Sequence, residues 1–520
     1  MPTLMTKKRS TVAVLGAAVA VGAFVPGASA DDAAQVRTVE GPVRGTVSKD
    51  VRTFQGIPYA APPTGERRWR PPQPARPWSA PLDASKPRAS CPQPSDQPIA
   101  VPSQNEDCLY LNVTTPAKTR GPLPVIVWIH GGSFVYGDGA GYGAAKLAAE
   151  GNVVVSINYR LGVFGFLSHL GLDAPANLGL LDQQATLKWV RRNASAFGGD
   201  ARNVTIMGQS GGGYSVCSQL VSPGARGLFD KAIVQSAGCV GDDAAMTLKK
   251  AQENGLATAK AAGCENTDDA DACLRRRSVP QLLAASESGH EGYRPVVDGA
   301  VLPMSPARAF AAGAFQRVPV LHGSTHDEES GRVGAEETVL GRPLTKDDYV
   351  KKVTETFGSD AQKVLAEYPV DAHGSAGAAL TAVMTDSQWS TDAFDTQRAL
   401  SRHVPVYAYD FAEKESPYFQ GFPRPSFPLG TGHMIDQAYL FEYKLFEPLN
   451  EPQAELSDAT ISYWSAFART GEPRAAGLPK WARFTPQGRY VQKLASGNGG
   501  IGRTDFAADH RYAFWTSLQR

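Results

Sequence analysis

Short apolar runs alternate with amphipathic segments through the first half of the chain. Three runs rich in Val and Ile, at residues 124–130, 152–158 and 204–208, have the length of buried strands and end at glycine or polar residues. Between the second and third runs, residues 180–192 place Leu, Ala, Trp and Val at helical spacing. Strands that alternate with helices favour a parallel sheet with helices on both faces, so the pattern predicts an α/β fold.

Two further apolar runs, at residues 232–235 and 318–322, extend the predicted sheet. Functional loops of such sheets lie beyond the carboxyl ends of the strands, where neighbouring strand ends converge. The glycine-rich turns and the polar residues that follow these runs therefore belong to one predicted functional edge.

The first thirty residues form a separate unit that predicts export. A basic head at Lys7, Lys8 and Arg9 precedes an apolar run, and Ala28-Ser29-Ala30 has the small residues of a signal-peptidase site. The run is too short to span a bilayer comfortably, so we expect cleavage before Asp31, secretion and no stable membrane insertion. The junction contains no Cys, so a lipid anchor is not indicated.

Residues 31–520 are expected to form a single domain with large insertions, because no low-complexity linker or internal repeat divides them. The Pro-rich stretch at residues 61–81 is a possible linker by composition. It contains Trp69 and Trp78, however, and aromatic side chains of that size generally dock onto a core.

The charge of the chain is balanced. The 52 Lys and Arg residues face 51 Asp and Glu residues, and removal of the first thirty residues leaves 49 against 51. Nucleic-acid binders need a concentrated basic surplus, so this class is excluded as the main function. The basic run Arg275-Arg276-Arg277 has acidic neighbours in sequence and is predicted to be a solvated surface.

Six cysteines in an exported chain permit disulfides. Their spacing suggests Cys91–Cys108 and Cys264–Cys273 as pairs that close compact local loops. Cys217 and Cys239 are left either as a pair or as buried thiols, and the sequence leaves both open.

Ser210 is the candidate nucleophile, in the turn Gly208-Gln209-Ser210-Gly211-Gly212. The turn follows a predicted strand and precedes a predicted helix, which is the setting that a strained Gly-x-Ser-x-Gly elbow requires. Small residues on either side allow strand and helix to pass each other, and the strain holds the Ser hydroxyl out of the sheet. A Gly-rich turn without chemistry is the alternative.

A second glycine motif, His130-Gly131-Gly132-Ser133, ends the predicted strand at residues 124–130. Glycines allow the backbone to approach a substrate oxygen closely and to aim amides at it. We predict that the amides of Gly132, Ser133 and Gly211 form an oxyanion hole.

These motifs resemble the type-B carboxylesterase and lipase family, which includes the cholinesterases. The sequence FGG at 197–199 with VTIMGQSGG at 204–212 is similar to the nucleophile signature of the family, and EDCLYLNV at 106–113 is similar to its second signature. Further family-like stretches lie at residues 54–60, 158–162 and 177–184. The resemblance implies an α/β-hydrolase fold and a secreted carboxylic ester hydrolase.

The resemblance also implies a Ser-Glu-His triad in that chain order. It places the acid at Glu328, in the turn after the run at 318–322, with the adjacent Asp327 as the alternative. It places the base at His433. Two departures from the family pattern are Glu329 and Met434, which stand where relatives often carry glycine.

The resemblance implies that Gln209 and Ser236 lie next to the triad. For Ser236, a structural role in core hydrogen bonding is the alternative. The resemblance supports the Cys91–Cys108 pair around a loop at the mouth of the site, and this loop contains no aromatic residue, so a quaternary ammonium site is not indicated there.

No metal or organic cofactor is required. Esters of small or medium acyl chains are expected, with a lipase acting on longer acylglycerols or a non-catalytic binding module as alternatives.

Overall fold

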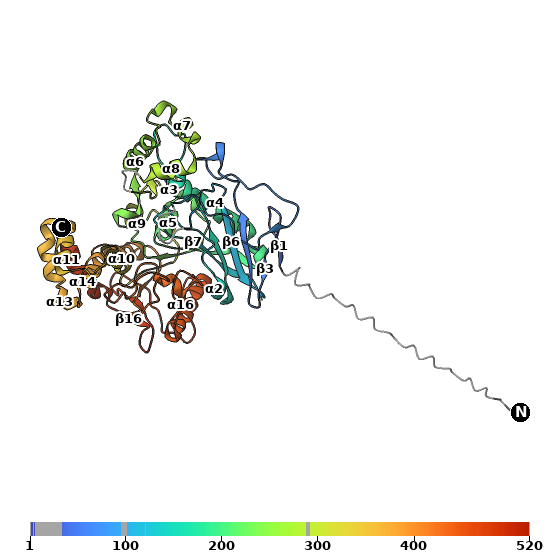
Figure 1. Ribbon diagram of the computed structural model, residues 1–520. Coiled ribbons are helices and arrows are strands. Elements are labelled where there is room, and N and C mark those ends of the chain that lie inside the picture. The colour runs from blue at the N-terminus through green and yellow to red at the C-terminus, as the bar shows by residue number, and fades with distance from the viewer. Residues whose placement is uncertain are drawn as a thin grey trace.

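The computed structural model describes residues 34–94, 101–119, 121–287 and 292–518, together with Pro2, Thr3 and Met5. Its centre is an 11-stranded mixed sheet (Figure 1). In sheet order the strands are β16 (Gly502–Thr504), β15 (Val491–Leu494), β14 (Val406–Phe411), β13 (Val320–Thr325), β10 (Lys231–Gln235), β9 (Gly199–Gln209), β7 (Leu123–Ile129), β8 (Val153–Ile157), β6 (Tyr110–Pro116), β4 (Val51–Pro58) and β3 (Thr46–Val47).

The strands from β15 to β8 pair in parallel, whereas both edges of the sheet are antiparallel. Outside this sheet, β1 (Gln35–Arg37), β2 (Pro42–Arg44) and β5 (Leu82–Asp83) form one small sheet, and β11 (Met246–Thr247) and β12 (Val296–Val297) form another. The predicted α/β-hydrolase fold with a mostly parallel sheet is confirmed.

Alternation along the strands divides the core into two layers. In β7, Val125, Val127 and Ile129 pack into one cluster, while Ile126 and Trp128 pack into the other. Because side chains of a strand point alternately to opposite faces, a run that is apolar throughout must be covered on both sides. The first face is covered by α4 (Leu178–Asn193) and α5 (Gly211–Val221), and the second by α2 (Ala145–Ala149) and α16 (Glu451–Thr470).

The remaining helices lie mainly in the excursions between strands. They are α3 (Gly162–Phe166), α6 (Leu248–Ala261), α7 (Ala270–Arg276), α8 (Val279–Ser286), α9 (Pro306–Ala312), α10 (Ser330–Leu340), α11 (Lys346–Phe357), α12 (Ala361–Glu367), α13 (Val370–His373), α14 (Ala376–Met384), α15 (Thr391–Ser401), α17 (Phe506–Asp509) and α18 (Tyr512–Leu518). A π-helical turn, η7 (Thr385–Ser390), joins α14 to α15. Figure 1 shows α6, α7 and α8 on one side of the sheet and α11, α13 and α14 at another.

The predicted strands and the predicted helix are confirmed, with changes at their boundaries. The strand β9 begins at Gly199, before the run expected at residues 204–208. The run expected at residues 318–322 is the strand β13, which begins at Val320 and continues to Thr325. Pro319 has no amide proton to donate to the ladder, so regular pairing starts after it.

The Pro-rich stretch docks onto the core as predicted. Trp69 is 1% exposed and its indole N–H donates to the carbonyl of Val163 at 2.8 Å. The indole N–H of Trp78 donates to the carbonyl of Pro42 at 2.7 Å. This segment is therefore a packed part of the domain.

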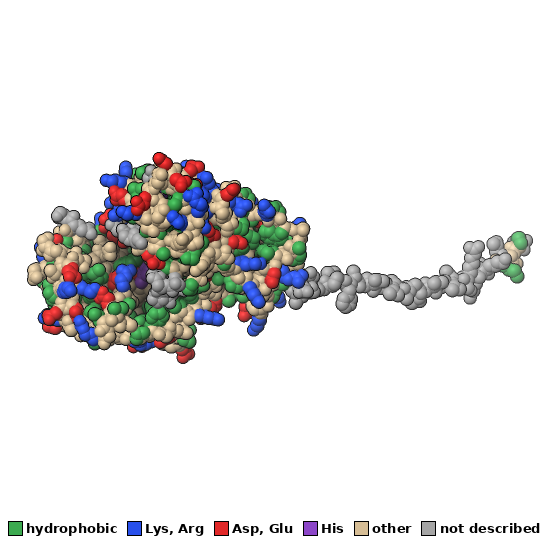
Figure 2. Space-filling model, turned by 45° about the horizontal axis from the view of Figure 1, so that its top comes forward, with side chains coloured by type: hydrophobic (Ala, Val, Ile, Leu, Met, Phe, Trp, Pro, Cys, Tyr) green, Lys and Arg blue, Asp and Glu red, His purple; other side chains and the backbone are tan. Residues whose placement is uncertain are grey.

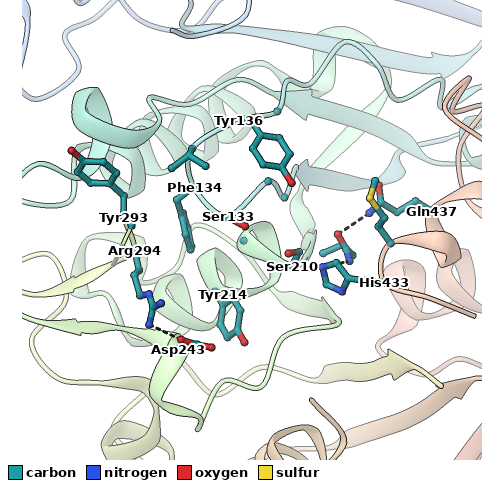
Figure 3. Close-up of a pocket in the computed structure, with 18 of the residues that line it drawn as sticks. Ser133, Phe134, Tyr136, Ser210, Tyr214, Asp243, Tyr293, Arg294, His433 and Gln437 are labelled. Carbon is teal, nitrogen blue, oxygen red and sulfur yellow. Dashed lines mark hydrogen bonds and ion pairs between the residues drawn. The ribbon is translucent and has the colours of Figure 1, made fainter. Parts of the chain in front are cut away.

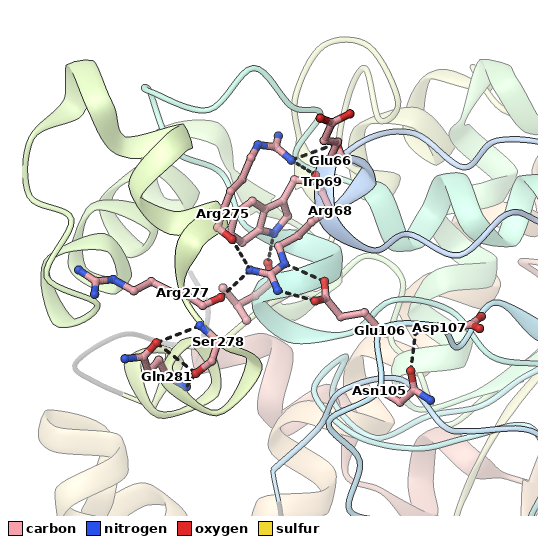
Figure 4. A network of polar contacts seen from close by, with 11 residues as sticks. Glu66, Arg68, Trp69, Asn105, Glu106, Asp107, Arg275, Arg277, Ser278 and Gln281 are labelled. Atoms are coloured by element: carbon pink, nitrogen blue, oxygen red, sulfur yellow. Dashed lines mark hydrogen bonds and ion pairs between the residues drawn. The ribbon is translucent and has the colours of Figure 1, made fainter.

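The prediction that the run Arg275–Arg277 is a solvated surface is wrong for Arg275. Its guanidinium lies 5.7 Å from the ring of Trp69, bonds Asp271 at 2.7 Å and donates to the carbonyl of Arg68 (Figure 4). Arg68 in turn bonds Glu106 and the carbonyl of Arg277. Contact with a segment about two hundred residues earlier in the chain, which local charge patterning does not reveal, leaves the side chain of this arginine 16% exposed.

The predictions for the N-terminal region, including the leader and its cleavage site, lie almost wholly outside the described residues. No helix in the described ranges has the length and apolar character to cross a bilayer. Figure 2 shows side chains of both charges interspersed over one face, in keeping with the balanced composition.

Candidate active site

Ser210 lies in a sharp turn between β9 and α5. Its φ and ψ are 56° and −126°, a strained conformation for a residue other than glycine. The turn is fixed because the amide of Ser210 donates to the carbonyl of Gln235 at 3.0 Å. A Cβ at Gly212 would lie 1.9 Å from the carbonyl oxygen of Ile129, and one at Gly208 would lie 2.3 Å from that of Gly212. Both glycines are therefore sterically required.

The predicted oxyanion residues gather beside this turn. Ser133 and Phe134 have φ values of 52° and 63°, which bends the loop after β7 back over α5. A Cβ built on Gly211 would lie 3.3 Å from the amide nitrogen of Ser133, so the two backbones are in contact. The amides of Gly132, Ser133 and Gly211 donate to no acceptor within the described residues. Clustered free amides of this kind can stabilise a negative oxygen.

Glu328 and His433 meet across the sheet edge. Nδ1 of His433 lies 2.5 Å from Oε2 of Glu328, which is 1% exposed. The other carboxylate oxygen of Glu328 accepts from the amide of Thr325 at 3.0 Å, and the amide of His433 donates to the carbonyl of Glu328 at 3.0 Å. These contacts orient the imidazole so that its Nε2 is directed away from the acid.

Asp327, the alternative acid, has a different partner. Its carboxylate accepts from the amide of Thr431 at 3.0 Å, and its own amide donates to the carbonyl of Thr431 at 3.0 Å. Burial raises the pKa of Asp327 above its ordinary value. The carboxylate that contacts His433 is therefore that of Glu328.

Ser210 and His433 line one cavity of about 390 Å³ (Figure 3). Figure 3 shows the two side chains next to each other, with Ser133 close to Ser210. The volume falls within the range of ligand clefts, about 300–1,000 Å³. Seven aromatic side chains also line the cavity: Phe134, Tyr136, Tyr142, Tyr214, Tyr293, Trp389 and Tyr443.

Trp389 is a site residue that sequence reasoning missed. Its ring centroid lies 4.8 Å from that of His433, and its indole N–H donates to Oε1 of Glu329 at 2.6 Å. Glu329 is 4% exposed and also bonds Arg332 at 2.9 Å. The glutamate that replaces the usual family glycine therefore holds an aromatic wall against the histidine. Its position beside Glu328 was the only signal in the sequence.

Gln209 lies next to His433 as expected. Its amide nitrogen is 3.3 Å from Nε2 of His433, and its carbonyl oxygen accepts from Gln437 at 2.7 Å. Met434, in place of the family glycine, has a φ of 66°, so this loop retains a left-handed conformation with a bulky residue.

Ser236 is fully buried with a φ of 48°, and its hydroxyl has no hydrogen-bond partner within the described residues. Within those residues, therefore, no hydrogen bond supports either expected role of Ser236, next to the triad or in core hydrogen bonding. Nearby, Gln235 donates to Asp436 at 2.6 Å, and burial raises the pKa of Asp436 to about 7.

The cysteines lie in three bonded pairs: Cys91–Cys108, Cys217–Cys239 and Cys264–Cys273. The loop closed by the first pair reaches the cavity rim, where the side-chain amide of Gln93 exchanges two hydrogen bonds with the backbone of Gly137, at 2.9 and 3.1 Å. The structure thus places Cys217 and Cys239, which sequence alone left open, in a pair.

A serine on a strained strand-to-helix turn, with free amides and a carboxylate-bound histidine at the same sheet edge, defines the protein as an α/β hydrolase. A family model described as "Carboxylesterase family" matches residues 32–515. The chain belongs to the carboxylesterase family and is a carboxylic ester hydrolase.

Named relatives agree along nearly the whole chain. It is 35% identical to para-nitrobenzyl esterase of Bacillus subtilis (strain 168), over 89% of this chain and 94% of that protein. It is 33% identical to human (Homo sapiens) cocaine esterase, over 95% of this chain and 93% of that protein. Among solved structures, a thermophilic PNB esterase superposes with a TM-score of 0.77 at 33% identity, covering 92% of this chain and 99% of that one.

Proposed function

We propose that the protein hydrolyses carboxylic esters through Ser210 as nucleophile, His433 as general base and Glu328 as the acid that orients it. The observation that carries this proposal is the 2.5 Å contact between Nδ1 of His433 and Glu328, in a cavity that His433 shares with Ser210. A carboxylate on Nδ1 leaves Nε2 free to take a proton.

In this mechanism, His433 removes the proton of Ser210 as its oxygen attacks the ester carbonyl. The tetrahedral oxyanion is bound by the amides of Gly132, Ser133 and Gly211. His433 then gives the proton to the departing alcohol, and the acyl group stays on Ser210. A water molecule activated by His433 releases the carboxylic acid and restores the enzyme.

The cavity favours small or medium uncharged acyl esters. Its volume of about 390 Å³ lies near the lower end for ligand sites, and aromatic side chains form part of its wall. Both arginines on the wall are paired: Arg294 with Asp243 at 2.5 Å (Figure 3), and Arg332 with Glu329 at 2.9 Å. Their charges are therefore compensated, which favours neutral substrates. The names of the two relatives, para-nitrobenzyl esterase and cocaine esterase, agree with ester hydrolysis.

The proposal includes secretion after cleavage before Asp31, and residues 31–520 as one domain. Three disulfides support an oxidising destination. The measurement is N-terminal sequencing of protein recovered from culture medium. A mature N-terminus other than Asp31, or retention in the cell, contradicts this part.

The nucleophile is tested by Ser210→Ala, for which we expect a loss of kcat of about 10⁶-fold with an unchanged melting curve. The matched control is Ser218→Ala on the same helix, whose hydroxyl only donates to the carbonyl of Tyr214. An organophosphate label should attach to Ser210 in the control and not in Ser210→Ala. Turnover that survives Ser210→Ala refutes the assignment, and a wild-type chain without esterase activity favours a binding module.

Substrate class is tested with a chain-length series of nitrophenyl esters alongside emulsified triglyceride. We expect kcat/KM to be highest for short and medium chains, because longer chains exceed the cavity. Higher turnover of emulsified long-chain triglyceride than of soluble short esters would identify a lipase instead.

A further inference from the structure

Behind the acid turn lies a second cluster of ionisable residues that the esterase mechanism does not use. His326, Asp410 and His510 offer one ligand atom each, and these atoms lie within 4.8 Å of one another. His326 is two residues before Glu328, Asp410 is on β14, and His510 follows α17. Three distant segments therefore converge on this point.

We propose that His326, Asp410 and His510 bind a divalent transition-metal cation, with Zn²⁺ as a matching ion. Two imidazoles and one carboxylate are a ligand set that such cations accept, with further positions left to water. A cation at about 2.0–2.2 Å from each atom needs them somewhat closer together. The side chain of His326 is 35% exposed and is the member with freedom to move.

The first support is the unpartnered polar atoms at this point. Nε2 of His510 and Oδ1 of Asp410 are buried without a hydrogen-bond partner in the described part of the chain. Their side chains are 3% and 1% exposed. Leaving a buried polar atom unpaired is costly, so an imidazole nitrogen and a carboxylate oxygen in this state indicate a missing partner.

The second support is the set of residues that orient the ligands. Nδ1 of His510 lies 2.6 Å from Oδ1 of Asp386, so its proton is held there and the lone pair of Nε2 is free. Asp386 is fixed by the hydroxyl of Tyr368 at 2.9 Å, and that hydroxyl accepts from the indole of Trp515 at 2.7 Å. A carboxylate behind a histidine in this way is the usual support of a metal-binding imidazole.

The third support is charge and access. Asp327, Asp386 and Asp410 all act on His326, and the side chains that compensate them are His326, His510 and Lys493. Histidines that bind a metal are neutral, which leaves Lys493 as the cation among these groups, so a divalent cation would balance the three carboxylates. His326, Asp327 and Asp410 also line a cavity of about 900 Å³, which provides an entry path separate from the ester cavity.

Protons compete with the metal at this site. Without a cation, Nδ1 of His326 lies 2.9 Å from the carboxylate of Asp410, where a proton on the imidazole is stabilised. His326 must release its proton to the buffer before it can bind the cation. Affinity therefore falls as the pH is lowered.

The test is calorimetric titration of the full, chelator-treated chain with ZnCl₂ at pH 8. We expect one Zn²⁺ per chain and a raised melting temperature. His510→Gln should weaken the affinity at least about 100-fold, and Asp386→Asn about 10–100-fold. The matched control is His403→Gln, which lies outside the cluster and should bind as the wild type does.

His326→Gln provides a second, more exposed ligand variant in case His510→Gln does not fold, and it should lose affinity to a similar extent. Affinity of the wild type should fall from pH 8 to pH 6. Absence of Zn²⁺ uptake by the wild type overturns the proposal. Equal affinity of the wild type, His510→Gln and His326→Gln also overturns it and places the cation elsewhere, for example at His433.

Discussion

The acid turn at residues 326–328 separates two histidine–carboxylate sites with the same chemical groups and different surroundings. On one side, Glu328 holds His433, which shares its cavity with the hydroxyl of Ser210. On the other side, Asp386 holds His510, whose free nitrogen is buried next to Asp410. A carboxylate orients the imidazole in both. The surroundings of the histidine decide its use: His433 shares a cavity with the hydroxyl of Ser210, whereas His510 lies beside further ligand atoms.

The two sites also share a support. The π-helical turn η7 carries Trp389, which lies against His433, and Asp386, which lies against His510. Single π-turns of this kind are frequent at functional sites because they redirect adjacent side chains. Here one turn supplies residues to both sides.

The largest effect that separates the two sites is expected from Glu328→Gln. The amide cannot hold the same tautomer or stabilise the imidazolium, so kcat should fall about 10⁴-fold in an assay with a nitrophenyl ester. Asp327→Asn is the neighbouring control and should cost far less, because that carboxylate contacts Thr431. If Asp327→Asn has the larger effect, the acid is misassigned.

Asp410→Asn should act on stability instead. The carboxylate is 1% exposed and bonds His326, so its loss should lower the free energy of unfolding of metal-free protein by about 1–3 kcal/mol in urea. This expected loss of unfolding free energy is smaller than the loss for a fully buried ion pair, because water reaches His326. Asp509→Asn, at an exposed position, should change it by less than about 0.5 kcal/mol. If Asp410→Asn leaves the free energy of unfolding unchanged, the cluster adds nothing to folding stability.

Glu329→Gln tests the aromatic wall between the sites. Loss of the charge-assisted bond to Trp389 should raise KM about threefold to tenfold, roughly 1 kcal/mol, with little change in kcat. Glu336→Gln, about two turns further along α10, is the control. A fall in kcat comparable to that of Glu328→Gln would instead make Glu329 part of the reaction.

The smallest effect is a pH dependence of stability. The pKa of His326 is raised to about 10, so the folded chain holds a proton that the unfolded chain releases above about 6.5. The resulting stability is complete below pH 6.5 and is lost as pH rises towards 10. Solvent screening of this partly exposed side chain keeps the slope below about 1.4 kcal/mol per pH unit. His326→Gln should flatten that slope in melting curves from pH 6.5 to 10, and an unaltered slope would contradict the ion pair.

The sequence by itself determined the strands around the site and the turn that carries Ser210. Apolar runs of strand length, β-branched residues and glycines at residues 208 and 212 act through local sterics and burial, which are readable along the chain. The family resemblance extended this to Glu328 and His433. Their chain order is a property of the sequence, and the structure brings their side chains to 2.5 Å.

Only the tertiary structure decided the surroundings of that turn. The pair Cys217–Cys239, the burial of Arg275 and the aromatic wall with Trp389 all depend on contacts between segments distant in sequence. The same holds for the cluster of His326, Asp410 and His510. Local periodicity reports which face of an element is buried, but not which other element covers it. Strand order and long excursions decide that.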